Sequence, residues 1–340
     1  MDVLSASELD ETLRRFLAED VGSGDLTTDS IVPEDAVAAA EIVAKSECVV
    51  SGLSVSRRVF ELLDPALSWD ERVPPGATVS PDTTLARLSG KGRAILTGER
   101  VALNLLQRMC GIATATRRYV DAVSGTGCRI LDTRKTAPGL RPFDRAAVRD
   151  GGGANHRAGL YDMVLIKDNH RAIAGGVNAA LGAVRRSAPP GLAVEVEVES
   201  EEDVLAAIAG GADVLLVDNQ SPATVRAWVG IARKSAPSPA IEASGNIRLA
   251  NVRAYALAGV DSISVGALTH SVVASDVSLE MAMKNTAGTG PAGLHPPQSQ
   301  RSDTAGTGPA GLHPPQSQRS DTAGTGPAGL HPPQSQGAPR

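Results

Sequence analysis

The sequence predicts an α/β fold organised around a parallel, barrel-like sheet. Beyond residue 127, short runs rich in β-branched residues alternate with segments of helical length and composition. Repeated strand–helix alternation is typical of parallel sheets. A full α/β barrel has eight strands, but six runs are visible: 128–132, 163–167, 193–198, 213–218, 240–243 and 262–266. Either one or two strands are hidden or the barrel is incomplete.

The segments around these strands favour helices. An N-terminal helix is expected from about Ser7, where Ser7 and Asp10 offer a cap and apolar residues follow on one face. A long helix is expected from Gly98 to about Val123. Extended segments are expected at 38–44 and 48–50, helices at 201–209, 222–235 and 248–257, and a last helix near 276–284.

The last 55 residues differ from the rest. An 18-residue unit, TAGTGPAGLHPPQSQRSD, starts at Thr286, repeats from Thr304 and begins again at Thr322. Gly and Pro make up 20 of these 55 residues, and each unit has one Leu. Because so little apolar surface cannot offset the entropy of ordering, we expect 286–340 to be a disordered tail. Its repeated histidines leave a weak metal or partner site as an alternative: His295, His313 and His331.

Composition excludes several classes of protein. The sequence has no apolar run of about 18 residues, the length of a membrane span. The acidic first 20 residues do not resemble a secretory signal. Three widely spaced cysteines suit a reducing cytoplasm rather than a disulfide framework or a zinc site. A net charge of −5, no basic run and 2% aromatic residues argue against a nucleic-acid partner.

Polar residues follow every predicted strand. They comprise 133–136, 167–170, Glu197, 218–219, 244–246 and 266–267. In α/β barrels the active site lies at the carboxyl ends of the strands, and the last two strand–helix loops often bind phosphate. Those two loops carry glycines here, so bare N–H groups can approach an anion. This pattern predicts a barrel enzyme with a phosphorylated substrate.

Each of these residues also has an ordinary explanation. Lys135 and Lys167 could be solvated surface charges, although the chain has only six lysines. Alternation puts the carboxylates of 195–199 on one face, which would also fit a wet edge strand. Asp218 could cap the next helix. The glycine loops could be plain turns, and a lone histidine is usually structural.

Taken together, the strand-end residues form a charged set. The cations are Arg134, Lys135, His156, Arg157 and Lys167, and the opposing carboxylates are Glu197 and Asp218. This set suits a substrate with several negative charges and a hard cation such as Mg²⁺. The sequence offers no Ser/His/Asp triad, reactive cysteine or redox motif. Group transfer to or from a phosphorylated sugar fits best.

Several longer strings carry a family resemblance. They are EDVGSGDLTT (19–28), GERVALNLLQRMCGIATAT (98–116), DTRKTAPGLR (132–141), GGGANHRAGLYDMVLIKDNH (151–170), EVEVES (195–200), LLVDN (215–219) and VGALTHS (265–271). In this order, from about residue 8 to 284, the chain resembles the quinolinate phosphoribosyltransferase family, also called nicotinate-nucleotide pyrophosphorylase (carboxylating).

The resemblance implies a fold and a reaction. It implies an N-terminal α/β sandwich domain at 1–110, an incomplete α/β barrel of six or seven strands at 111–275, and a helix end at 276–285 before the tail. It implies a homodimer in which one subunit's sandwich domain covers the partner's barrel. The implied reaction joins quinolinate to phosphoribosyl pyrophosphate, giving nicotinate mononucleotide, pyrophosphate and CO₂ for NAD biosynthesis, with Mg²⁺ and no organic cofactor.

The resemblance also implies roles for individual residues. Arg134, Lys135 and Arg157 would bind the carboxylates of quinolinate beside His156, and Arg100 would reach across the dimer interface. Lys167 would contact phosphoribosyl pyrophosphate or the reacting centre, and Glu197 and Asp218 would hold Mg²⁺ and face the ribose; with Lys135, these form the predicted catalytic set. The 5′-phosphate cradle would comprise Ser244, Gly245, Asn246, Gly266 and Ala267, with His270 just beyond. Asn246 departs from the Ser-Gly-Gly expected of the family, but Asn tolerates left-handed backbone.

Two other functions are compatible with the scaffold. One is a paralogue of the same fold linked to molybdenum-transport operons, and the other is a non-catalytic sensor of phosphoribosyl compounds. The complete DTRKT and GGGxNHR motifs favour the quinolinate enzyme over the paralogue. The presence of Lys135, Glu197 and Asp218 argues against a silent sensor.

Overall fold

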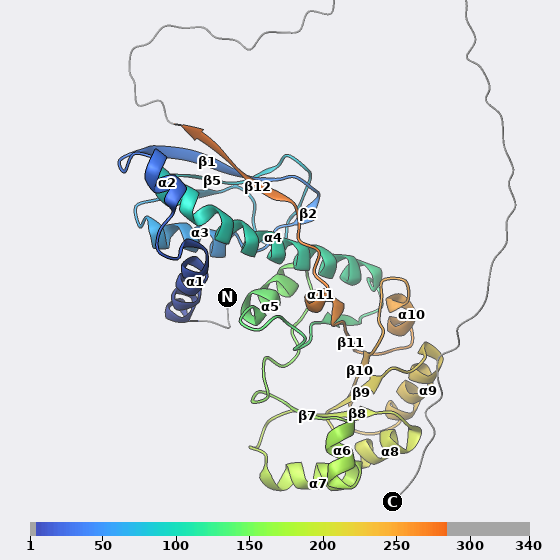
Figure 1. Ribbon diagram of the computed structural model, residues 1–340. Helices are drawn as coiled ribbons and strands as arrows, with labels where there is room; N and C mark the ends of the chain where they lie inside the picture. The colour runs from blue at the N-terminus through green and yellow to red at the C-terminus, as the bar shows by residue number, and fades with distance from the viewer. Residues whose placement is uncertain (1–4, 284–340) are drawn as a thin grey trace, which may run out of the picture. The chain divides into compact units, whose positions relative to one another are not determined.

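A computed structural model describes residues 5–283 of the chain (Figure 1). The predicted disordered tail lies outside these residues. Among them, no helix combines the length and the apolar character needed to cross a membrane.

The N-terminal part combines helices with a small antiparallel sheet. Its sheet has the order β12-β1-β5-β3, and β2 pairs with β4 beside it. The elements are α1 (Ala6–Val21), α2 (Leu26–Ile31), β1 (Val37–Ala44), β2 (Cys48–Val49), α3 (Leu53–Leu63), β3 (Ser68–Glu71), β4 (Thr78–Val79), β5 (Thr84–Lys91) and β12 (Val277–Met283).

The N-cap of the first helix lies two residues before the predicted one. Ser5, not Ser7, is the N-cap: its hydroxyl accepts from the Glu8 N–H at 3.3 Å, and the Glu8 carboxylate accepts from the Ser5 N–H at 2.8 Å. Ser5 and Glu8 thereby satisfy two backbone N–H groups at the start of the helix, one each. Ser7 and Asp10 do not form such a pair. Ser7 therefore lies within the first turn.

The segment after the barrel is a strand, so the predicted helix near 276–284 is wrong. β12 pairs antiparallel with β1, with Val277 opposite Ala44 and Leu279 opposite Ile42. Val277 is buried and Leu279 half-buried, whereas Glu280 is exposed. The free edge of β1 gives this segment hydrogen-bond partners along its length, whereas a helix this short would leave most of its backbone N–H and C=O groups unpaired. The chain thus returns to the N-terminal sheet after completing the barrel.

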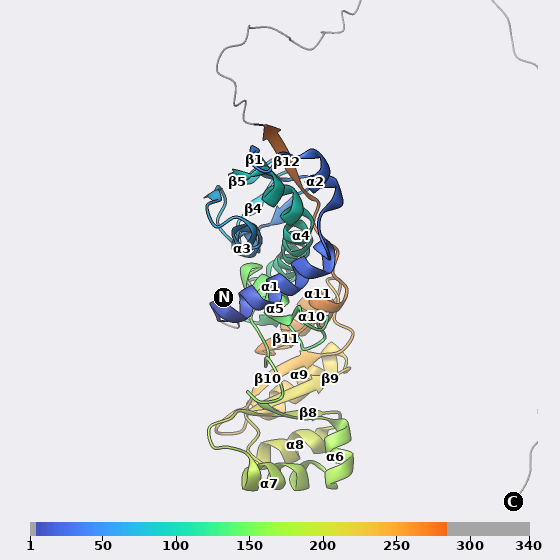
Figure 2. The ribbon, with the colours of Figure 1, turned by 60° about the vertical axis from the view of Figure 1, so that its left-hand side comes forward.

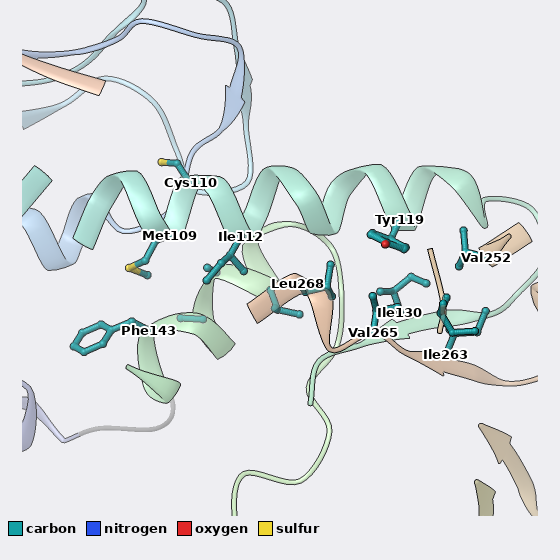
Figure 3. Packing of buried hydrophobic residues seen from close by; sticks show 14 of the residues in the cluster. Met109, Cys110, Ile112, Tyr119, Ile130, Phe143, Val252, Ile263, Val265 and Leu268 are labelled. Atoms are coloured by element: carbon teal, nitrogen blue, oxygen red, sulfur yellow. The ribbon is translucent and has the colours of Figure 1, made fainter. Parts of the chain in front are cut away.

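A long helix, α4 (Gly92–Ala122), connects the N-terminal sheet to the barrel. It starts six residues before the predicted position. Figure 3 shows Met109, Ile112 and Tyr119 on the side of α4 that faces the barrel elements, with Cys110 on the opposite side. The predicted domain boundary at 110/111 falls inside this helix, and the division into domains stays a prediction.

The barrel contains the six predicted strands. They are β6 (Arg129–Leu131), β7 (Val164–Ile166), β8 (Val194–Val198), β9 (Val214–Asp218), β10 (Ala240–Ser244) and β11 (Ser262–Ser264). They pair in parallel in the order β6-β11-β10-β9-β8-β7. Within residues 5–283, no pairing joins β6 to β7, so the barrel is open and incomplete, as predicted.

Helices follow the barrel strands. They are α5 (Arg141–Asp150), α6 (Asp168–Ala174), α7 (Val177–Ser187), α8 (Glu201–Ala209), α9 (Pro222–Ala232), α10 (Val252–Ala256) and α11 (Ala267–His270). Figure 2 shows α6, α7 and α8 together on one side of β8. Because β8 lies between β9 and β7, and both Glu195 and Glu197 are buried, the interpretation of this strand as a wet edge strand is wrong.

The glycine-rich segment 151–153 serves close packing. A Cβ on Gly151 would lie 2.5 Å from the carbonyl oxygen of Ala113, and one on Gly153 would lie 2.8 Å from Cγ2 of Thr116. Both neighbours belong to α4. Only residues without a side chain allow the chain to pass this close to the helix. The segment thereby fixes the start of the loop that carries His156 and Arg157.

Candidate active site

The carboxyl ends of the barrel strands surround a cavity of about 680 Å³. Nine of the residues predicted from the sequence line it: Arg134, Lys135, His156, Arg157, Lys167, Asp218, Ser244, Gly245 and Asn246. Thr133, Arg141, Leu165, Leu216, Asn219, Glu242 and Ser264 complete the lining. The structure therefore brings together, in one place, side chains from six separate segments of the sequence.

Glu197 stands directly beside this cavity. Its carboxylate lies 3.4 Å from the Lys167 ammonium and accepts from the Asp168 N–H at 3.3 Å. The Glu197 side chain is 7% exposed and that of Lys167 is 47% exposed. Glu197 near the end of β8 and Asp218 at the end of β9 therefore place two carboxylates at the ends of adjacent strands.

Gly266 and His270 flank Lys135 at the edge of the cavity. A Cβ on Gly266 would meet Cδ of Lys135 and Cδ2 of His270, each at 3.1 Å. The Thr269 hydroxyl donates to the Lys135 carbonyl at 2.9 Å. Ala267 starts α11 next to Gly266. The last strand–helix loop is thus packed against the Lys135 backbone and side chain.

The loop after β10 uses left-handed backbone. Gly245 has φ 86° and Asn246 has φ 52°. The Asn246 side-chain amide donates to Oδ1 of Asn219 at 3.0 Å, and the Asn219 N–H donates to the Ser244 carbonyl at 3.0 Å. Asn246 fits this left-handed turn, as expected of the departure from Ser-Gly-Gly. The supporting role of Asn219 was missed from the sequence.

Arg100 does not join this group. It is exposed on α4, and the residues that line the cavity in the described part of the chain do not include it. Its predicted contact across a dimer interface stays a prediction.

Asp132, a residue of the DTRKT motif, fixes the loop that carries His156 and Arg157. Its buried carboxylate accepts from the His156 N–H at 2.7 Å and from the Asn155 side chain at 2.6 Å. Arg145 donates to the His156 carbonyl at 2.6 Å and lies 3.6 Å from the Asp132 carboxylate. Burial raises the pKa of Asp132, although these hydrogen bonds and the Arg145 charge oppose the effect. Sequence reasoning gave Asp132, Arg145 and Asn155 no role.

Three titratable side chains form a buried cluster at the base of the cavity. His156 Nε2 lies 3.1 Å from Oε2 of Glu195 and 3.6 Å from Oε1 of Glu242. Within residues 5–283, both oxygens of Glu195 and Oε1 of Glu242 have no hydrogen-bond partner, so the His156–Glu195 contact is an ion pair without good alignment. Three such groups within 4.8 Å could also hold a metal ion.

The cluster shifts the protonation of its members. Burial raises the pKa of Glu242 to about 7, and the nearby Glu195 charge adds to the effect, while His156 and the Ser264 and Ser262 hydroxyls oppose it. Burial lowers the pKa of His156, but the two carboxylates outweigh it and raise the value above the ordinary range. Glu242 was missed because a single carboxylate inside the apolar run 240–243 resembles an interruption of the strand pattern.

An open α/β barrel with cations, carboxylates and a left-handed Ser-Gly-Asn turn around one cavity defines an enzyme that acts on anionic, phosphorylated substrates. The comparisons specify the family. The model of the quinolinate phosphoribosyl transferase N-terminal domain matches residues 25–110, and that of the C-terminal domain matches residues 112–280. The chain belongs to this family.

Individual relatives agree over nearly their whole length. The chain is 44% identical to a probable nicotinate-nucleotide pyrophosphorylase [carboxylating] of Bacillus subtilis, covering 82% of this chain and 95% of that protein. It is 43% identical to the nicotinate-nucleotide pyrophosphorylase [carboxylating] of Mycobacterium leprae, covering 82% and 100%. The crystal structure of NadC from Streptococcus pyogenes matches with a TM-score of 0.79 at 36% identity, covering 84% and 100%. The predictions of family, enzymatic nature and decarboxylating phosphoribosyl transfer are thereby confirmed.

Proposed function

We propose that the cavity holds quinolinate and phosphoribosyl pyrophosphate together and joins them with loss of CO₂ and pyrophosphate. The observation that carries this proposal is the lining itself. Arg134, Lys135, Arg157 and Lys167 converge on one space that also contains Asp218 and the left-handed turn at 244–246. Four cations suit two substrates that together carry carboxylates, a phosphate and a pyrophosphate.

Within this proposal, the cations position the pyridine ring. Arg134, Lys135 and Arg157, beside His156, bind the two ring carboxylates and hold the ring nitrogen against C1 of the ribose. Holding two reactants in reacting geometry removes much of the entropic cost of their encounter. Departure of pyrophosphate leaves positive charge on the ribose, which Glu197 and Asp218 stabilise electrostatically. Decarboxylation follows because the positive charge of the quaternised nitrogen stabilises the electron pair left at C2.

The phosphate ends of the substrate occupy the opposite side of the cavity. Ser244, Gly245 and Asn246 offer backbone N–H groups and a hydroxyl to the 5′-phosphate, and Gly266 and Ala267 continue this cradle beside His270. Support comes from Gly245, whose left-handed backbone leaves no room for a side chain next to Asn219. Lys167 contacts phosphoribosyl pyrophosphate from β7.

Glu197 and Asp218 also fit a divalent cation. Their oxygens stand at the ends of adjacent strands, and Mg²⁺ is usually held by one or two carboxylates together with substrate phosphates. When bound, Mg²⁺ would neutralise charge on the leaving pyrophosphate. No organic cofactor is needed, since the substrate's own cationic ring stabilises the electron pair at C2.

We further propose that the working form is a cytoplasmic homodimer with shared active sites. Large apolar side chains are exposed at 74% for Leu160, 77% for Tyr161 and 88% for Ile173, all between the end of α5 and the end of α6. Leu26 and Ile31 of α2 are 83% and 73% exposed. Such apolar groups favour contact with a second copy, which would bring Arg100 to the cavity. Three free, buried cysteines support a reducing compartment.

The test is quinolinate-dependent release of pyrophosphate from phosphoribosyl pyrophosphate. Lys135→Ala should abolish turnover and leave the far-ultraviolet circular dichroism unchanged, whereas the matched control Lys234→Ala, at an exposed position, should keep full activity. A folded Lys135→Ala variant with near-full turnover would overturn the assignment. Release that does not depend on quinolinate would favour the paralogue instead.

Sharing of the site has its own test. Lys135→Ala and Arg100→Ala subunits, each inactive alone, should regain activity on mixing, because one site of the mixed dimer would contain both native residues. No recovery in a mixture that light scattering shows to be dimeric would contradict a shared site.

A further inference from the structure

The buried cluster of His156, Glu195 and Glu242 has no role in the reaction derived above beyond placing His156. Glu195 is fully buried and Glu242 is 3% exposed, yet Glu242 and His156 both line the cavity. Two carboxylates this close, out of water, cannot both carry a charge cheaply. A single imidazolium balances one of them. The other carboxylate therefore keeps a proton that it would lose in neutral water.

The charges around Glu242 make it the member that keeps this proton. Glu195 of β8 faces it with a negative charge, and His156 faces it from the loop after α5. From β11, the Ser262 hydroxyl is 3.5 Å from Oε2 of Glu242, while Oε1 has no partner in the described chain. Burial raises the pKa of the nearby Cys128 to about 12, so that its thiol is neutral. A carboxylic acid whose Oε1 lies 3.6 Å from His156 Nε2 thus lines the cavity.

The proposed reaction consumes one proton. When CO₂ leaves, the bond from C2 to the carboxylate breaks and its electron pair stays on C2 of the ring. The product carries hydrogen at this carbon, so a C2–H bond must form. Leu165, Leu216 and Glu242 line the same cavity as the cations proposed to hold the ring carboxylates, so Glu242 borders the space proposed for the ring.

We propose that Glu242 is the catalytic acid that donates a proton to C2 as the bond from C2 to the carboxylate breaks, with His156 and Glu195 as its positioning residues. The O–H bond of Glu242 breaks, the C2–H bond forms, and Glu242 is left as a carboxylate beside the imidazolium. A proton from water, relayed through His156, restores the acid for the next turnover. This inference rests on the proposed function, because it needs quinolinate in the cavity.

The experiment separates the two chemical steps in Glu242→Gln, which keeps the shape but removes the acid. In rapid-quench single turnovers, pyrophosphate release should stay within about threefold of the unchanged protein. CO₂ release should fall by about a hundredfold, the usual range for loss of a general acid, and quinolinate mononucleotide should accumulate. Glu34→Gln, at an exposed position, is the matched control and should change neither step.

A second measurement separates proton donation from a merely structural role. In an equal mixture of H₂O and D₂O, the deuterium fraction at C2 of the product depends on the group that delivers the hydrogen. It should differ between the unchanged protein and Glu242→Gln, and Glu242→Asp should restore the original fraction at a lower rate. An unchanged fraction in Glu242→Gln, or equal slowing of both steps, would overturn the proposal.

Two further outcomes are distinguishable. If the unchanged protein releases no pyrophosphate from quinolinate and phosphoribosyl pyrophosphate, the proposed function fails, whatever Glu242 does. If elemental analysis finds one divalent cation per chain that Glu242→Gln loses, the cluster is a metal site and the proton-donor role is wrong. In the expected result, metal content is the same in both proteins.

Discussion

Replacement of Asp132 by Asn tests whether the loop at 154–157 is held in place for substrate binding. Asp132 accepts two hydrogen bonds from this loop, at 2.6 and 2.7 Å. An amide offers one acceptor oxygen, and its NH₂ group would face another donor, so at least one bond is lost. Hydrogen bonds to a charged group contribute about 1.5–3 kcal/mol. Since about 1.4 kcal/mol corresponds to a tenfold change, kcat/KM should fall by roughly 10- to 100-fold.

The assay is steady-state pyrophosphate release with each substrate varied in turn. Because His156 and Arg157 are proposed to bind the pyridine carboxylates, KM should rise for quinolinate and stay within about twofold for phosphoribosyl pyrophosphate. Asp70→Asn, which alters an exposed ion pair with Arg72, is the control and should change neither value. A normal KM for quinolinate in Asp132→Asn, or equal rises for both substrates, would refute the reasoning.

The same variant has a predicted pH dependence of stability. The pKa of Asp132 is raised in the folded protein, mainly by burial. The stability that Asp132 contributes is therefore fully present below its pKa in the unfolded chain, and it is lost as pH rises through its pKa in the folded protein. The amide of the Asp132→Asn variant does not titrate in this range. The stability difference between the unchanged protein and Asp132→Asn should therefore grow as pH falls from 7 toward about 4, the ordinary value for Asp. Urea midpoints at several pH values measure it, and a constant or shrinking difference would contradict the assigned direction.

Three other changes have defined outcomes. Arg108→Met removes both 2.8 Å hydrogen bonds to the fully buried Asp144 and should cost about 3–5 kcal/mol in urea unfolding; a loss below about 1 kcal/mol would contradict this. Gly245→Ala places a Cβ against Oδ1 of Asn219 at φ 86°, so strain of about 1–2 kcal/mol should raise KM for phosphoribosyl pyrophosphate about 5- to 30-fold, and an unchanged KM would argue against the cradle. Deletion of 286–340 should leave turnover and assembly unchanged, and an inactive or monomeric truncation would show that the tail contributes.

The barrel strands were predictable from sequence because each is a short β-branched run covered on both faces. In a parallel sheet such runs are local signals, and all six occur within two residues of the predicted limits. The segment at 277–283 gives no such signal. Its strand exists because β1 offers an unpaired edge, and β1 lies near the other end of the described chain. Pairing between distant segments is a property of the fold, which local propensity does not contain.

The residues of the candidate site also separate into those that local sequence signals predict and those that depend on contacts between distant segments. Residues that follow strands, such as Lys135 and Asp218, could be predicted because the carboxyl ends of parallel strands meet. Asp132 could not be given a role, since its partners come from the loop at 154–157, which returns to β6 through the bridge between Leu131 and Ala154. That return depends in turn on Gly151 and Gly153 passing close to α4.

The charged side chains of the cavity must also be tolerated by the protein when no substrate is bound. Burial lowers the pKa of Arg157, and repulsion from Arg134 lowers it further, so cations gathered for an anionic substrate destabilise each other before the substrate binds. The buried Glu195 and Glu242 lie beside His156, where their charge offsets part of that repulsion. Glu195, which is fully buried and absent from the cavity lining, supplies the negative charge beside His156. Glu242 lines the cavity itself, but as the proposed neutral acid it does not compete with quinolinate for the same cations.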